Sequence, residues 1–236
     1  MEKGKLLYDG KAKQIYATDN DDQIIMHYKD DATAGNGVKH ETFGGKGVLN
    51  HTISGIIFDM LEEAGVKTHL IEKLDERDDL VKKVTIFPLE VIVRNITTGS
   101  FCRRTGCEEG LICDPAIFEI SYKDDNHGDP LINEDHARVM GLCTPEEYAE
   151  IKSQTLKINE LLKAFFLELN LKLVDFKIEF GKTADGEILL ADEISPDSCR
   201  LWDVDTNQKY DKDVFRQDIG DLIETYKAVL ARMENK

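Results

Sequence analysis

Apolar and charged residues alternate in the sequence VDFKIEF, which runs from Val174 to Phe180. Because successive side chains of a β-strand point to opposite faces, the valine, the isoleucine and the two phenylalanines share one face. The other face carries Asp175, Lys177 and Glu179. The pattern therefore predicts a strand with one buried face and one charged face.

The dipeptide Asp185-Gly186 follows this strand and favours a two-residue hairpin turn. With this turn, Glu179 faces Asp192 across the hairpin. Two carboxylates in such a position repel each other unless a cation lies between them. Oxygen ligands of this kind suit Mg²⁺, which usually also binds substrate phosphates. The alternative is a hairpin whose charged face is solvated, with Lys177 shielding its neighbours.

The N-terminal region shows the pattern of an antiparallel meander. Short apolar strands flank the dipeptide Asp9-Gly10, and a third strand follows the acidic turn at 19–22. Lys11 and Lys13 come directly after the first turn, where they could hold the phosphates of a nucleotide under the hairpin. Two surface lysines on an edge hairpin are the alternative.

Three segments have apolar residues at helical spacing. The first is 48–64, with Gly65 as its stop. The second begins with Thr144 as its N-cap and proline at the first helical position. The third is about 213–233. These segments predict helices that each place one apolar face on a core.

Pro88 interrupts a run of strand-like sequence. Strands are expected at 67–74, 80–86 and 89–94. Because proline cannot donate a hydrogen bond to a central ladder, we expect the chain to cross between two lobes at 84–88. This gives an N-terminal β-rich lobe, 1–84, and a C-terminal α+β lobe, 85–236.

A polar loop follows the strand that ends at Arg94. Its sequence, ITTGSFCRRTG, contains Ser100, Arg103 and Arg104. Hydroxyl groups and arginines around a glycine suit a phosphate monoester, whereas a polar turn is the alternative. Farther along, Lys123 lies in a second polar segment and is another candidate site residue.

Charge and composition limit the classes of function. The chain has 236 residues and a net charge of −16, which argues against binding to nucleic acids or to a membrane surface. No apolar run approaches the roughly 18 residues of a membrane span, and the first residues do not resemble a secretion signal. We interpret the five cysteines as reduced thiols of a cytoplasmic protein.

The sequences IFPLEVIVRNITTGS (86–100) and LVDFKIEFG (173–181) resemble the two characteristic stretches of the SAICAR synthetase family of purine biosynthesis, the phosphoribosylaminoimidazole-succinocarboxamide synthases. The resemblance continues through LYDGKAKQIY, DDATAGNG, DDNHGDP and DEISPDSCRLWD. It implies a two-lobed α+β fold related to the ATP-grasp enzymes, with antiparallel sheets, flanking helices and the nucleotide in the cleft between the lobes.

The resemblance also implies an activity. The family joins the carboxylate of carboxyaminoimidazole ribotide (CAIR) to the amine of L-aspartate, and ATP is cleaved to ADP and phosphate. The cofactors would be ATP and Mg²⁺, and bacterial members are commonly homodimers. Amide formation needs a leaving group on the carboxylate, and an acyl phosphate supplies one.

The motifs and the resemblance together suggest four groups of site residues. The nucleotide is expected at Gly10, Lys11, Ala12, Lys13, Lys82, Glu179 and Asp192. Mg²⁺ is expected at Glu179 and Asp192, with Asp175 close by. The catalytic candidates are Lys123, Lys177 and Asp175. The substrate candidates are Arg94, Ser100 and Arg200 for the ribotide phosphate, and Lys46, Asn36, Asp197 and Ser198 for aspartate.

Asn36 departs from the family pattern, because many relatives carry aspartate there; the amide keeps hydrogen bonding but loses a charge, which argues against a role of this position as a metal ligand or a base.

Two other functions are considered. A small-molecule kinase could use the same carboxylates and lysines, but it would leave a stable phosphorylated product. A nucleotide-sensing module would bind ATP and release no ADP with any pair of substrates.

Overall fold

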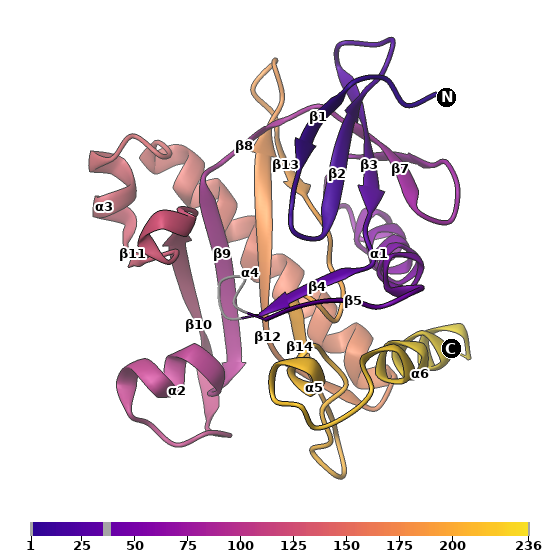
Figure 1. Cartoon of the computed structure of the whole chain (residues 1–236). Coiled ribbons are helices and arrows are strands. Elements are labelled where there is room, and N and C mark those ends of the chain that lie inside the picture. Colours follow the sequence, from indigo (N-terminus) through magenta and orange to yellow (C-terminus); the bar gives the residue numbers. More distant parts are fainter. Residues whose placement is uncertain (1, 35–38, 236) are drawn as a thin grey trace.

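The computed structural model describes residues 2–34 and 39–235, which form an α+β fold built on two antiparallel sheets (Figure 1). The five-stranded sheet has the order β1-β2-β3-β7-β6. Its strands are β1 (Leu6–Asp9), β2 (Lys13–Ala17), β3 (Gln23–Tyr28), β6 (Leu70–Lys73) and β7 (Asp78–Lys82). A separate two-stranded sheet consists of β4 (Asp31–Ala34) and β5 (Lys39–Thr42).

The seven-stranded sheet has the order β11-β10-β9-β12-β13, and β8 and β14 also pair with β12. Its strands are β8 (Thr85–Ile86), β9 (Leu89–Ile96), β10 (Ile112–Tyr122), β11 (Leu131–Ile132), β12 (Leu171–Lys182), β13 (Ile188–Ala191) and β14 (Cys199–Asp203). The 12-residue strand β12 is thus hydrogen-bonded to four others. It is the predicted strand, and it organises this part of the fold.

Six α-helices and one 3₁₀ helix, η1, occur in the described residues. They are α1 (Lys46–Glu63), α2 (Gly99–Thr105), η1 (Asp125–His127), α3 (Glu134–Val139), α4 (Pro145–Glu168), α5 (Asp213–Arg216) and α6 (Leu222–Glu234). The predicted start of α4 is confirmed, because Thr144 and Glu147 cap each other's backbone N–H groups. None of the described helices combines the length and apolar composition of a membrane span.

The main core lies between helix α4 and strands β9 and β12. Phe176 and Ile178 of β12 pack there with Phe166 of α4, and all three are almost fully buried. Burial of each such side chain contributes about 1.5–3 kcal/mol. Ile53 and Ile57 of α1 belong to the same core, so a helix from the first third of the chain is packed with the C-terminal strands.

The two large sheets are joined by the segment that precedes β6. Thr68 forms a parallel bridge with Leu190 of β13, and the backbone N–H of His69 donates to the Leu190 carbonyl at 2.9 Å. The five-stranded sheet contains only strands before residue 83, and the seven-stranded sheet only strands after residue 84. Pro88 lies between β8 and β9, where its carbonyl accepts the Lys123 N–H.

His69 lies in this connecting segment and gives the stability of the protein a predicted pH dependence. Burial, together with the nearby Lys13, lowers the pKa of the imidazole from 6.5 to about 3. Below pH 6.5 the unfolded chain binds a proton that the folded chain does not, so the free energy of unfolding should fall as the pH falls from 6.5 towards 3. The contribution of this residue is at most about 1.4 kcal/mol per pH unit.

The measurement is urea unfolding from pH 7.5 to pH 4.5 for the wild type and His69→Gln, which removes the titrating ring. We expect the variant to lose less stability over this range. Parallel stability curves for the two proteins would contradict the assignment to His69.

The turn of the β12–β13 hairpin differs from the prediction. The Thr183 N–H donates to the Glu187 carbonyl at 2.9 Å, so three residues rather than two form the loop. The Thr183 hydroxyl also accepts the Glu187 N–H at 2.9 Å. Gly186 has a φ of 93°, the left-handed conformation that a three-residue loop of this type needs and glycine supplies.

This loop shifts the register by one residue. Glu179 pairs with Ala191 and not with Asp192, so the predicted facing pair of carboxylates is wrong. Asp192 follows the end of β13 with a φ of 61°. Glu179 and Asp192 therefore do not repel each other as a cross-strand pair, and this repulsion was the basis for predicting a metal site here.

Three other predicted elements also differ from the structure. The loop expected after Arg94 contains the helix α2, with Thr98 as its N-cap. The long helix expected at 213–233 is two helices, because the chain breaks at Asp218, whose φ is 55°, and α6 starts anew where the Asp221 side chain accepts the Glu224 N–H. The strands expected at 67–74 and 80–86 are shorter and are divided among β6, β7 and β8.

Candidate functional site

Glu179 lies in the C-terminal half of β12 and is almost fully buried. Lys123 follows β10 in the chain, and its Nζ lies 2.6 and 2.8 Å from the two carboxylate oxygens of Glu179. The structure thus brings together two predicted site residues that are far apart in the sequence. The Lys123 side chain is 44% exposed, so solvent can reach this pair from one side.

Asp192 and Glu193 form the second acidic position. The buried Lys13, at the start of β2, is hydrogen-bonded to the Asp192 carboxylate, and its Nζ lies 2.6 Å from Glu193 Oε2. A lysine of the five-stranded sheet therefore reaches the acidic end of β13. The prediction did not include Glu193, which no periodic pattern distinguishes from Asp192 beside it in the sequence.

The loop that joins β1 to β2 carries three more of the predicted nucleotide contacts, Gly10, Lys11 and Ala12. Lys29 holds it, because the Lys29 Nζ donates to the Gly10 carbonyl at 3.0 Å and the Lys29 N–H donates to the Ala12 carbonyl at 2.8 Å. Lys11 in this loop lies 2.6 Å from Asp125 of η1, and this hydrogen bond raises the pKa of the lysine. The loop therefore spans from the first sheet to the segment after β10.

Two predicted lysines have partners elsewhere. Lys177 lies on the same face of β12 as Glu179 and is ion-paired with Glu90 of β9. Lys82, the last residue of β7, lies 4.0 Å from Glu187 at the outer end of the hairpin. Of the two, only Lys177 shares a strand face with the acidic residues.

A cluster of charged side chains surrounds Arg94 on β9. Its guanidinium donates to Asp175 at 2.9 Å, to Glu119 at 2.8 Å and to the Ser100 hydroxyl at 3.1 Å. Arg94 is almost fully buried, so these acceptors compensate for the loss of water around its charge. Two predicted substrate residues, Arg94 and Ser100, are thus in direct contact.

Arg200 of β14 belongs to the same cluster. Its Nη1 lies 2.8 Å from Asp175 Oδ2, and its Nε donates to Asp213 at 2.9 Å. Burial alone would lower the pKa of Arg200, but these two carboxylates outweigh burial and raise it. Gly99 has a φ of 56°, and a Cβ there would lie 2.7 Å from Arg200 Nη2, so a larger residue would displace the guanidinium.

Asp175 therefore bridges two arginines. Its Oδ2 accepts hydrogen bonds from both Arg94 and Arg200, and its Oδ1 accepts a second one from Arg200. Both oxygens are occupied by guanidinium groups, which suits the positioning of arginines better than the predicted place near a metal. We call Arg94, Ser100, Asp175 and Arg200 the arginine cluster.

The residues predicted for aspartate form a buried group. The Nζ of the fully buried Lys46 lies 2.5 Å from Asp197, whose other oxygen accepts the Tyr226 hydroxyl. Burial alone would raise the pKa of Asp197, but Lys46 and Lys212 outweigh it and hold the pKa well below its usual range. Ser198 follows in the loop before β14, and its carbonyl accepts the Lys177 N–H.

Asn36 lies outside the described residues.

The carboxylates near Lys13 and Lys123 fit a cation. In the described part of the chain, no three His, Cys, Asp or Glu side chains are placed to hold a metal ion by themselves. Mg²⁺ does not require such a set, since it is usually held by one or two carboxylates together with substrate phosphates. The ammonium groups of Lys13 and Lys123 already lie where these oxygens attract positive charge.

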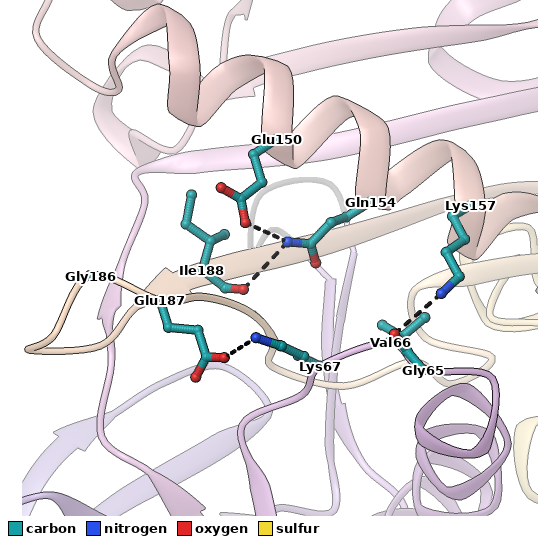
Figure 2. A pocket seen from close by; sticks show the side chains of 9 residues that line it. All are labelled: Gly65, Val66, Lys67, Glu150, Gln154, Lys157, Gly186, Glu187 and Ile188. Atoms are coloured by element: carbon teal, nitrogen blue, oxygen red, sulfur yellow. Dashed lines mark hydrogen bonds and ion pairs between the residues drawn. The ribbon is translucent and has the colours of Figure 1, made fainter.

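A cavity of about 280 Å³ lies apart from these groups, between α4 and the hairpin loop (Figure 2). Its polar side chains bind one another: Gln154 contacts Glu150 and the Ile188 carbonyl, and Lys67 contacts Glu187. None of the predicted site residues lines it. The candidate site is therefore formed by the acidic residues with their lysines and by the arginine cluster, not by this cavity.

Comparison with known proteins identifies the family. The sequence profile of the SAICAR synthetases matches residues 6–233. The chain belongs to the SAICAR synthetase family. The phosphoribosylaminoimidazole-succinocarboxamide synthase of Finegoldia magna is 64% identical over 99% of both chains, and that of Fusobacterium nucleatum is 58% identical over the full length of both.

Solved structures of SAICAR synthetases share the fold. One, a SAICAR synthetase in complex with ADP, has a TM-score of 0.94 and 47% identity, with 97% of each chain covered. The synthase of Ehrlichia chaffeensis has a TM-score of 0.95 and 42% identity, with 98% of each chain covered. The predicted α+β fold of this family is confirmed.

Proposed function

We propose that this SAICAR synthetase is an ATP-dependent ligase that joins CAIR to L-aspartate and releases SAICAR, ADP and phosphate. The names of its full-length relatives and the ADP complex of a similar structure support this function. The observation that carries the proposal within the molecule is β12, which holds Glu179 toward one end and Asp175 in the arginine cluster toward the other. One strand thus connects a nucleotide site with a phosphate site.

The nucleotide phosphates are assigned to the acidic end of the hairpin. Lys11 and Lys13 would contact them from the five-stranded sheet, and Lys123 and Lys177 from the other side. Glu179 and Asp192 would hold Mg²⁺, which supplies charge neutralisation at the transferring phosphoryl group when it is bound. The lysines that now pair with these carboxylates would then be free to turn toward the phosphates.

The 5′-phosphate of the ribotide is assigned to the arginine cluster. Two guanidinium groups and the Ser100 hydroxyl offer several donors to one phosphate monoester, and arginine binds phosphate with two parallel hydrogen bonds. Asp175 keeps Arg94 and Arg200 oriented before the phosphate arrives. Preorganised donors of this kind reduce the entropy that binding must overcome.

L-Aspartate is assigned to the region of Lys46, Asp197 and Ser198. Because Lys46 and Asp197 are buried against each other, they would shape this region while exposed neighbours contact the amino acid. A homodimer in the cytoplasm completes the proposal, in keeping with the reduced thiols of all five cysteines.

The reaction proceeds in two steps in this proposal. The CAIR carboxylate attacks the γ-phosphoryl group of ATP, and the resulting acyl phosphate converts a carboxylate oxygen into part of a leaving group. The lysines neutralise charge in this step, and the arginine cluster holds the far end of the ribotide. The aspartate amine then attacks the acyl carbon, and phosphate leaves.

Oxygen labelling tests these steps. With ¹⁸O in both carboxylate oxygens of CAIR, one labelled oxygen should appear in the released phosphate, because the bond to carbon breaks when phosphate leaves. Mass spectrometry of the phosphate gives the result. Unlabelled phosphate, with labelled CAIR consumed normally, would contradict the acyl phosphate.

ADP release, measured with CAIR alone and with CAIR and aspartate together, separates the alternatives. A kinase would release ADP with CAIR alone and leave a stable phosphorylated product, and a sensor would release no ADP with any pair of substrates. We expect sustained turnover, with ADP and phosphate in equal amounts, only when CAIR and aspartate are both present.

A further inference from the structure

Two cysteines meet at the end of α2. The Sγ atoms of Cys102, in the helix, and Cys107, beyond its end, lie 3.6 Å apart. Gly106 makes this approach possible, because its left-handed backbone, with a φ of 74°, turns the chain back while its N–H donates to the Cys102 carbonyl. Both thiols are partly exposed, so a small reagent can reach them.

The two cysteines belong to neighbouring segments in contact, because the Cys102 thiol donates to the Glu108 carbonyl at 3.5 Å and the Cys107 N–H donates to the Thr105 hydroxyl at 3.3 Å. Cys107 begins a segment tied to the end of β9, because the Gly110 N–H donates to the Thr97 carbonyl and the Thr97 hydroxyl donates to the Glu108 carbonyl. Cys102 lies in α2, a helix of seven residues with no buried side chain. A covalent bond between the two sulfurs would therefore fix a loosely packed helix to the strand end.

Helix α2 is in turn coupled to the arginine cluster. The Ser100 hydroxyl accepts a hydrogen bond from Arg94, and Phe101 lies beneath the Arg94 guanidinium with 5.8 Å between the Arg94 Cζ and the ring centre. Arg104 contacts Glu119, which also accepts the Arg94 Nε–H. Three side chains of α2 thus link the position of this helix to that of Arg94.

We propose that Cys102 and Cys107 form a reversible disulfide that weakens binding of the ribotide phosphate at the arginine cluster. The sulfurs must approach by about 1.5 Å to reach the length of a disulfide bond. This movement draws the middle of α2 toward Cys107 and displaces Ser100 from Arg94. The effect on binding rests on the proposed function, whereas the formation of the bond does not.

The chemistry is exchange with a low-molecular-weight disulfide. One thiolate attacks a sulfur of the reagent and releases a first thiol, and the second cysteine then attacks the mixed disulfide and releases another. Two protons and two electrons pass from the cysteines to the two thiols released. Burial and the neighbouring Cys107 raise the pKa of Cys102, so exchange should be faster at pH 8.5 than at pH 7.

The test uses the full-length protein treated with hydroxyethyl disulfide. Mass spectrometry after alkylation should show a peptide with Cys102 linked to Cys107. The KM for CAIR should rise at least fivefold, the KM for ATP should stay within twofold, and dithiothreitol should reverse both the bond and the change in KM.

Cys113→Ser is the matched control, because it removes a partly exposed thiol of β10 and leaves the pair intact. It should respond as the wild type does. Cys107→Ser and Cys102→Ala should form no such bond and, measured after the same treatment without reduction, should keep their KM for CAIR.

Absence of the linked peptide in the treated wild type would overturn the proposal, and so would a linked enzyme with an unchanged KM for CAIR. If the reduced protein formed no SAICAR at all, the proposed function would fail, and the peptide masses would still decide whether the pair forms.

Discussion

Glu179→Gln and Asp192→Asn should each lower the rate of ATP-dependent SAICAR formation by about 10²–10³-fold, the usual effect of losing one electrostatic contact to a transition state. Each amide keeps the shape of the side chain and removes the negative charge that would hold Mg²⁺ near the phosphates. The folded state should change little for Glu179→Gln, because its partner Lys123 is half exposed and such ion pairs contribute about 1 kcal/mol or less. The measurement is ADP release at saturating CAIR, aspartate and Mg²⁺.

Glu224→Gln is the matched control for this pair of variants. Glu224 has an ion pair with Lys227 on the surface of α6, and both side chains are exposed. Its turnover should equal that of the wild type. Rates near wild type in both Glu179→Gln and Asp192→Asn would show that these carboxylates do not serve the nucleotide.

Arg94→Lys should raise the KM for CAIR at least tenfold and leave the KM for ATP within twofold. Lysine keeps the charge but cannot donate to Asp175, Glu119 and Ser100 with the planar group that now joins them. The variant should also lose about 1–3 kcal/mol of unfolding free energy, because buried acceptors are left without a donor. Steady-state kinetics and urea unfolding measure the two effects.

Arg104→Lys provides the comparison, since Arg104 contacts the same Glu119 from an exposed position. Both of its KM values should stay within twofold of the wild type, and its stability within about 1 kcal/mol. If Arg94→Lys instead raised the KM for ATP as much as that for CAIR, Arg94 would belong to the nucleotide site.

Periodicity in the sequence was enough to predict the elements with a continuous apolar face. The strand around Phe176 was predicted because its apolar residues alternate with charged ones, and the helix after Thr144 because its apolar residues recur at helical spacing. Both are confirmed. The hairpin register could not be predicted in this way. The Thr183 hydroxyl, which accepts the Glu187 N–H, and the left-handed Gly186 together form a three-residue loop, and one residue in loop length changes every cross-strand pair.

Short elements with no apolar face escaped prediction for a related reason. Helix α2 buries no side chain, so it leaves no hydrophobic period in the sequence. The break at Asp218 between α5 and α6 was missed because the apolar spacing continues through it by chance, with Ile219 exposed. Local capping by Asp221 decided the start of α6.

The candidate site was predicted as a set of residues but not as a set of pairs. Sequence reasoning selected Lys13 and Asp192, and Arg94 and Asp175, without showing that each pair is in contact. Their partners lie up to 179 residues apart along the chain, and only the fold brings them together. Glu193 was missed altogether, because its ion pair with Lys13 forms only when the fold brings the five-stranded sheet next to the end of β13.

Strand β12 also sets a length. Asp175 and Glu179 are four residues apart on one face of it, and their ladder partners on β9 and β13 follow without a bulge between these positions. At about 3.3 Å per residue their Cα atoms are ~13 Å apart, and a strand hydrogen-bonded along this segment cannot stretch or shorten. Under the proposed assignment, this fixed distance selects the length of the ribotide. A molecule that is one ring longer or shorter cannot bring its phosphate to the arginines and its carboxylate to the nucleotide at the same time.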